Sequence, residues 1–279
     1  MKPVLLDLTF GGAGLKLGAY SVFYTLAWVL APLIGAYVAR RQGLPAQRAL
    51  AIYAIALASG ILGARLFDLF IAWDFYAEEP SRILGLSFQG FSLYGGLVVA
   101  TLAGIGLAHL WRLPVWRLAD SAVPALAAGI VLMRAGCFFH GCCFGIETAL
   151  PWGVVYPPGS PAWAYQAVTS SSGLLGAIGG VVQPVHPTQL YEMLAALLLT
   201  TLALVLMRRR TPDGVPFLAF ALGFTLFRLG NGFLRVRQPV ITAPEWFYPV
   251  FYLGLAGVLL ALLVIRARRG PDSATQPQE

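Results

Sequence analysis

Charged residues are scarce in this 279-residue chain, where Asp, Glu, Lys and Arg make up 11% and hydrophobic residues 58%. Because soluble domains carry about 25% charged residues, this composition excludes an ordinary soluble protein and indicates an integral membrane protein. Asp7 and a glycine cluster interrupt the first apolar run before a signal-peptide core can form. We therefore expect the first hydrophobic helix to be retained.

Cysteine is also scarce, and all three cysteines lie between residues 137 and 143. This placement excludes a disulfide framework spread over a secreted fold. The chain lacks an internal repeat, which argues against a transporter built from matched halves. It also lacks a basic recognition helix or stacking platform, so we assign the net charge of +7 to contacts with lipid headgroups and expect no nucleic-acid partner.

Long apolar runs are abundant instead, and seven are long enough to cross a hydrocarbon core of about 30 Å. They lie near residues 19–39, 49–73, 91–110, 119–139, 188–207, 216–234 and 245–265. Most arginines fall in alternate connections between these runs, which should be cytoplasmic. The sequence therefore predicts an all-α integral membrane protein with seven transmembrane helices, the N-terminus outside and the C-terminus inside.

The chain reads as one polytopic membrane domain over residues 1–270. A polar, low-complexity segment at 271–279 follows and predicts a disordered cytoplasmic tail. The longest connection, about 140–187, is rich in aromatic residues, proline and glycine, which favours an ordered extracytoplasmic cap over a linker.

Five charged residues fall within the predicted spans or at their rims, where an unpaired charge is costly and usually faces a cavity: Arg65, Asp68, Arg134, Glu192 and Arg228. Arg134 and Arg228 lie near the outer ends of separate spans and form a planar, permanently charged clamp suited to a phosphate or phosphodiester. The alternative is that Glu192 serves as a structural counterion for one of them. Arg235, at the outer mouth, extends the positive surface or simply reaches toward the interface.

The stretch "MRAGCFFHGCCFG" at residues 133–145 contains all the thiols and leaves several interpretations open. Cys137 could form a disulfide with Cys142 or Cys143, because the external compartment is oxidising. The thiols could instead pack at the end of a span, or one could act as a covalent nucleophile. A zinc or redox site with His140 is a further possibility, although this spacing is more cramped than that of usual zinc ligands.

The heptapeptide "HPTQLYE" at residues 186–192 resembles the signature of the bacterial prolipoprotein diacylglyceryl transferases. Further segments resemble motifs of that family and follow in the same order. They are "GAYSVFY" at 18–24, "SLYGGLV" at 92–98, "RAGCFFHGCCFG" at 134–145 and "FRLGNGFLR" at 227–235. The resemblance covers nearly the whole chain.

This resemblance implies a multi-pass enzyme of the bacterial cytoplasmic (inner) membrane. It implies transfer of the diacylglyceryl group of phosphatidylglycerol to the lipobox cysteine thiol of a prolipoprotein, with release of glycerol phosphate. The implied partners are phosphatidylglycerol, the prolipoprotein signal peptide and membrane lipid, and we expect a monomer. No metal and no soluble cofactor is implied.

The chain departs from the family pattern at the groups that handle protons. Tyr94 stands where the family has histidine, Cys137 and Cys142 stand where it has asparagine and glutamate, and Gly232 replaces a second glutamate. These departures indicate a divergent, cysteine-containing paralogue. The alternative function is therefore a protein that binds phospholipid, acts on another acceptor, or acts as a non-enzymatic membrane partner.

The resemblance and the residue chemistry together define the candidate site. We expect Arg134 and Arg228 to meet the charge of the departing phosphate, His140 to accept the thiol proton, and Tyr94 to donate a hydrogen bond. His186 is partly structural, because the following proline fixes the turn. The predicted substrate-binding residues are Tyr20, Arg134, Gly145, His186, Gln189, Tyr191, Glu192, Arg228 and Arg235.

Overall fold

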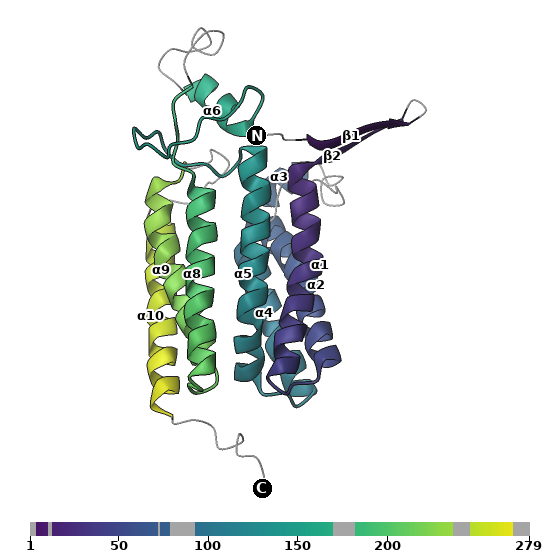
Figure 1. The fold of residues 1–279 in the computed structure, drawn as a ribbon, viewed down its shortest axis with the longest axis vertical. Coiled ribbons are helices and arrows are strands. Elements are labelled where there is room, and N and C mark those ends of the chain that lie inside the picture. The colour runs from purple at the N-terminus through teal and green to yellow at the C-terminus, as the bar shows by residue number, and fades with distance from the viewer. Residues whose placement is uncertain are drawn as a thin grey trace. The chain divides into compact units, whose positions relative to one another are not determined.

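The structure is a computed structural model that describes residues 4–10, 13–71, 73–78, 93–169, 182–236 and 246–269. The predicted tail at 271–279 lies outside the described residues. The described elements, shown in Figure 1, are β1 (Val4–Phe10), β2 (Ala13–Gly18), α1 (Ala19–Arg41), α2 (Ala46–Ile71), α3 (Trp73–Glu78), α4 (Leu93–Leu110), α5 (Val115–His140), α6 (Pro161–Thr169), α8 (Thr188–Arg208), α9 (Val215–Leu234) and α10 (Phe247–Arg268).

Six of these helices are long and apolar enough to cross a membrane: α1, α2, α5, α8, α9 and α10. A seventh apolar stretch, Gly95–Leu110 in α4, is shorter. Large apolar side chains point outward along the helices, as Leu198 on α8 (61% exposed) and Leu253 on α10 (57% exposed) illustrate. Outward apolar faces are expected where lipid replaces water. The prediction of a helical, multi-pass membrane protein is confirmed.

A short β-hairpin precedes α1, and sequence analysis did not predict it. Strands β1 and β2 pair antiparallel, with Asp7 opposite Lys16 in the register. The sequence "GLKLG" of β2 alternates polar and apolar residues with the period of a strand. That signal is too short to stand out beside the long apolar run that follows it.

The chain divides into two compact units, residues 32–125 and the remainder. The division points fall within α1 and α5, directly beside Pro32 and Pro124. Proline lacks a backbone N–H and therefore interrupts the hydrogen-bond ladder of a helix.

In the unit of residues 32–125, α2 and α4 pack closely through glycines. A side-chain carbon added at Gly63 would lie 2.6 Å from the carbonyl oxygen of Gly95, and one at Gly96 would lie 2.9 Å from that of Gly60. Small residues let membrane helices approach closely, so these glycines are explained by packing.

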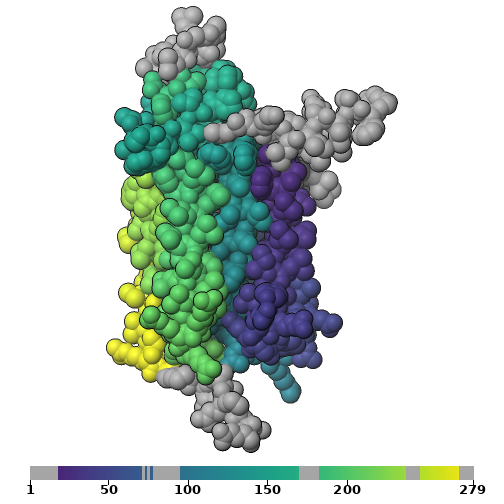
Figure 2. All heavy atoms as spheres, in the orientation of Figure 1, coloured from purple at the N-terminus to yellow at the C-terminus, as the bar shows by residue number. Residues whose placement is uncertain are grey.

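In the other unit, α9 packs against both α8 and α10, and the three lie side by side in Figure 1. The connection between α5 and α8 is ordered where it is described, with Val154 and Val185 joined by backbone hydrogen bonds of 3.0 Å. Phe144, Tyr156 and Val185 form its buried core. In the space-filling view this connection packs over the end of the unit where α8 begins (Figure 2). The first residues of α8 therefore lie beside it.

Candidate functional site

Glu192, on α8, is the centre of a cluster of charges and is only 2% exposed. Its carboxylate accepts a 2.6 Å hydrogen bond from Nε of Arg134 on α5 and a 2.5 Å hydrogen bond from a terminal nitrogen of Arg228 on α9. Arg235, directly after α9, lies 3.6 Å from the same carboxylate. Three positive charges and one negative charge leave this arginine cluster with a net charge of +2.

The three guanidinium groups are partly open to solvent, whereas the carboxylate is not. The side chains of Arg134, Arg228 and Arg235 are 20%, 19% and 24% exposed, compared with 3% for Glu192. Glu192 thus fixes the orientation of the guanidinium groups from the buried side. Their planar N–H groups remain accessible, and such groups suit a multivalent oxyanion such as phosphate.

Two residues that sequence analysis missed complete the cluster. Asn231 donates from its amide nitrogen to Glu192 at 3.3 Å, and Arg228 donates to the hydroxyl of Tyr252 at 3.2 Å. Asn231 is buried, and its amide oxygen has no hydrogen-bond partner among the described residues. The three-residue spacing from Arg228 could have identified Asn231 as a member of the same helix face. The sequence offers no comparable signal for Tyr252.

A second cluster, which we call the thiol cluster, consists of Cys137, Cys142 and Cys143. Their sulfur atoms all lie within 4.8 Å of one another. All three are free thiols, so the disulfide considered from the sequence is not formed. Arg134 lies 3.9 Å from the sulfur of Cys137, and therefore the two clusters adjoin.

The backbone after α5 turns sharply and brings the three thiols together. Gly141 has φ of 79°, and the N–H of Cys142 donates to the carbonyl of Cys137 at 3.1 Å, which closes the helix in a Schellman-type cap. Cys143 also has a positive φ, 60°, which is uncommon for a residue with a side chain. This conformation costs free energy and needs support from its surroundings.

The "HPTQLYE" motif supplies that support through the first turn of α8. The Thr188 hydroxyl donates to the carbonyl of Cys143 at 2.7 Å, and the Gln189 amide donates to the carbonyl of Cys142 at 2.6 Å. Gln189 also donates to the hydroxyl of Tyr156 at 3.0 Å. Both motif side chains are buried, so they fix the conformation of the thiol cluster.

Electrostatics within the thiol cluster favour one thiolate. Hydrogen bonds from Cys137 and Cys142 lower the pKa of the Cys143 thiol, and the nearby Arg235 and Arg134 act in the same direction. Hydrogen bonds with Cys137 and Cys143 raise the pKa of the Cys142 thiol. Negative charge in the cluster is therefore favoured at Cys143.

Several of the other predicted site residues lie around these two clusters. Gly145 donates its N–H to the carbonyl of His186 at 2.9 Å, and a side chain at Gly145 would collide with that residue. A ring nitrogen of His186 lies 3.1 Å from the hydroxyl of Tyr191, which also accepts a hydrogen bond from Trp152 at 2.8 Å. These contacts join the start of α8 to the connection that precedes it.

The remaining predicted residues divide between the two units. Tyr20, at the start of α1, stacks on Tyr24 and lies 5.8 Å from the ring of His140 at the end of α5. Tyr94 belongs to the first turn of α4, in the other unit, and its side chain lies outside the described part of the structure. The structure therefore brings all the predicted residues except Tyr94 into one unit.

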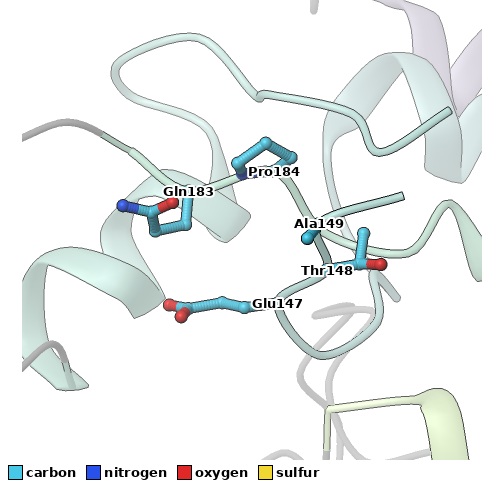
Figure 3. A pocket seen from close by; sticks show the side chains of 5 residues that line it. All are labelled: Glu147, Thr148, Ala149, Gln183 and Pro184. Carbon is cyan, nitrogen blue, oxygen red and sulfur yellow. The ribbon is translucent and has the colours of Figure 1, made fainter. Parts of the chain in front are cut away.

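A hollow of about 420 Å³ lies on the α5–α8 connection, where Glu147, Thr148 and Ala149 face Gln183 and Pro184 (Figure 3). Glu147 is the one charged residue of this lining, and its negative charge disfavours phosphate. The arginine cluster is therefore the better candidate for binding an anionic headgroup.

Comparison with known proteins shows which family this chain resembles. Residues 7–267 match the family model described as prolipoprotein diacylglyceryl transferase. Proteins named phosphatidylglycerol–prolipoprotein diacylglyceryl transferase are similar along their length. One from Geobacter sulfurreducens is 34% identical over 90% of this chain and 92% of its own, and one from Synechococcus elongatus is 32% identical over 98% and 95%. The chain thus belongs to the prolipoprotein diacylglyceryl transferase family.

Proposed function

We propose that this protein transfers the diacylglyceryl group of phosphatidylglycerol to the lipobox cysteine thiol of a prolipoprotein and releases glycerol phosphate. Membership of the family makes the chain a diacylglyceryl transferase, and the names of its relatives supply the donor and the acceptor. The observation that carries the proposal is the arginine cluster around Glu192.

The charge of this cluster fits the reaction better than it fits the bound donor. The phosphodiester of phosphatidylglycerol carries one negative charge, and a second develops on the departing phosphate as the glyceride carbon–oxygen bond breaks. A net charge of +2 matches this later state. Interactions that strengthen as charge develops lower the barrier, whereas equal binding of substrate and transition state does not.

Each member of the arginine cluster has a role in the proposal. Arg134 and Arg228 bind the phosphate oxygens, and Arg235 attracts the headgroup from the mouth of the site. Glu192 positions the guanidinium groups from the buried side of the cluster. The unpartnered amide oxygen of Asn231 accepts a hydrogen bond from a glycerol hydroxyl of the headgroup, because a buried acceptor without a partner is costly.

The other predicted residues act around this centre. His140 is the candidate proton acceptor, with Tyr20 beside it, and Tyr94 donates a hydrogen bond to headgroup or acceptor. Gly145, His186, Gln189 and Tyr191 shape the wall of the site, where the contacts of Gln189 and His186 support a positioning role.

We further propose a single membrane domain over residues 1–270 that crosses the membrane seven times, with α4 as the third span. The N-terminus and the connection at about 140–187 face outward, and the C-terminus and its tail face the cytoplasm. The bacterial inner membrane is the compartment, because phosphatidylglycerol and unprocessed prolipoproteins meet there. We expect the protein to act as a monomer.

Purified protein in phosphatidylglycerol liposomes provides the test. A lipobox peptide should gain the mass of one diacylglyceryl group, and a peptide with serine in place of the cysteine should gain none. Arg228→Gln should abolish the gain. Arg208→Gln, at the far end of α8 and exposed, is the matched control and should retain it. A folded protein that binds the lipid without transferring it would instead favour a non-enzymatic paralogue.

A further inference from the structure

We propose that Cys137, Cys142 and Cys143 bind one Zn²⁺ ion, and that the acceptor cysteine thiol occupies the fourth coordination position. The ion would then generate the thiolate that attacks the lipid. This inference rests on the proposed function, because it assigns a means of activating the thiol acceptor.

The geometry of the thiol cluster fits such an ion. Zinc–sulfur bonds of about 2.3 Å place the sulfur atoms of a tetrahedral site about 3.8 Å apart. The three sulfur atoms already lie within 4.8 Å of one another, so side-chain rotations are sufficient. A disulfide requires an S–S distance of about 2.0 Å and joins only two of the three thiols, so the third would remain unpaired.

The backbone is arranged for this convergence before any ion binds. The helix cap at Gly141 and the positive φ of Cys143 turn the adjacent cysteines back toward Cys137. Thr188 and Gln189 bond the carbonyls of Cys143 and Cys142 and support that conformation. The cramped spacing of the three cysteines in the sequence is therefore compatible with their binding one metal ion.

The number of ligands indicates a catalytic site rather than a structural one. Among the side chains that the structure describes, no histidine nitrogen or carboxylate joins the three sulfur atoms in the group. Structural zinc sites have four protein ligands, whereas catalytic sites have three and keep one position for water or substrate. Cys142 and Cys143 are only partly buried, which leaves access to that position.

The reaction gives this open position a use. A free cysteine thiol has a pKa of about 8.5 and is only a few per cent ionised near neutral pH. A thiol bound to zinc is deprotonated. Three protein thiolates and Zn²⁺ carry a net charge of −1, and a fourth thiolate makes it −2, which keeps the acceptor sulfur electron-rich. Arg134 and Arg235 lie close enough to offset this charge.

The acceptor thiol displaces a zinc-bound water and gives its proton to His140, the proton acceptor of the proposed function. The zinc-bound sulfur then attacks the glyceride carbon, forming a carbon–sulfur bond with its electron pair. The carbon–oxygen bond to the phosphate breaks, and its electron pair leaves with glycerol phosphate. The product is a neutral thioether, a weak zinc ligand, which leaves the ion free to bind water again.

The thiol cluster lies beside the arginine cluster, as this reaction requires. Arg134 contacts the sulfur of Cys137 at 3.9 Å and Glu192 at 2.6 Å. The ion would therefore place the attacking sulfur beside the guanidinium that meets the departing phosphate. Juxtaposing nucleophile and leaving-group stabilisation is a large source of catalysis.

Metal binding can be measured without an activity assay. The chain contains just these three cysteines, and so any thiol signal comes from the thiol cluster. Full-length protein purified under reducing, oxygen-free conditions should contain one zinc per chain by elemental analysis. After chelation, added Cd²⁺ should give a sulfur-to-metal charge-transfer band, and added Zn²⁺ should block all three thiols from alkylation. Cys137→Ser, Cys142→Ser and Cys143→Ser should each lose the tight site. His109→Ala removes a histidine of the other unit and should retain it.

A separate measurement tests whether the acceptor thiol binds the metal ion. Adding a lipobox peptide to the Cd²⁺-loaded protein should raise the charge-transfer band by roughly a third as a fourth thiolate binds, and the serine peptide should not. In liposomes, chelated protein should transfer at least about tenfold more slowly, with Zn²⁺ restoring the rate.

The outcomes separate the two proposals. Transfer at the full rate by metal-free protein, or a disulfide with no metal uptake in the wild type, would overturn the zinc inference and leave the proposed function standing. Zinc bound at the three thiols with no transfer in any metal state would overturn the proposed function and, with it, the catalytic role of the ion.

Discussion

Replacing Glu192 by glutamine should weaken the fold and the site together, because one buried carboxylate compensates three guanidinium groups. The substitution keeps the shape but leaves a net charge of +3 where the wild type has +2. Breaking a fully buried ion pair costs about 3–5 kcal/mol. The guanidinium groups here are 19–24% exposed and keep part of their hydration, so we expect about 2–3 kcal/mol.

The assay is thermal unfolding of the detergent-solubilised protein with and without inorganic phosphate. A loss of this size corresponds to a melting temperature lower by roughly 4–12 °C. Phosphate should stabilise Glu192→Gln more than the wild type, because the uncompensated arginines bind the anion more strongly. Glu147→Gln, an exposed carboxylate of the same unit, is the matched control and should leave melting unchanged.

A double-mutant cycle makes the reasoning refutable. Once Arg228 is replaced by glutamine, removing the Glu192 charge should cost about 1–2 kcal/mol less than it does alone. Additive losses, or a single mutant that melts like the wild type and responds to phosphate equally, would show that Glu192 does not organise the arginines.

Three further predictions concern single features. Arg134→Lys should lower the transfer rate about 10- to 100-fold with folding intact, because an ammonium cannot replace a fork-shaped guanidinium; a near-normal rate would make Arg134 a structural counterion. Gly145→Ala should lower the yield of folded protein, since the new carbon would lie 2.5 Å from the carbonyl of Leu234. Reporter fusions at Gly159 should read external and those after Arg210 cytoplasmic; a cytoplasmic reading at Gly159 would exclude the proposed outward-facing connection.

The sequence predicted most of the helices and the core of the arginine cluster for one physical reason. In an apolar chain a charged residue is conspicuous, and its cost in a membrane implies a partner or a cavity. Glu192, Arg134 and Arg228 therefore stood out, and the structure joins them directly. Asn231 and Tyr252 did not stand out, because neutral polar side chains cost less within a span.

The thiol cluster could be located from the sequence, but its geometry could not. The spacing of Cys137, Cys142 and Cys143 is more cramped than that of usual zinc ligands, and therefore the sequence alone argued against a shared metal ion. Their convergence depends on two positive φ values after α5, at Gly141 and Cys143. Cysteine has no preference for a positive φ, and therefore no local sequence pattern predicts this conformation at Cys143.

The reason lies 45 to 47 residues further along the chain, in the first turn of α8. Thr188 and Gln189 bond the backbone of the thiol cluster, and Glu192, one turn later on the same helix, bonds the arginines. In the proposed mechanism, a movement of α8 would therefore carry both clusters together and preserve the distance between the attacking sulfur and the departing phosphate. Because misplacement by about 1 Å can cost about 100-fold in rate, one rigid helix that positions both partners is a direct way to protect the reaction geometry. The proposed mechanism thus accounts for the occurrence of Thr188, Gln189 and Glu192 together in one short motif.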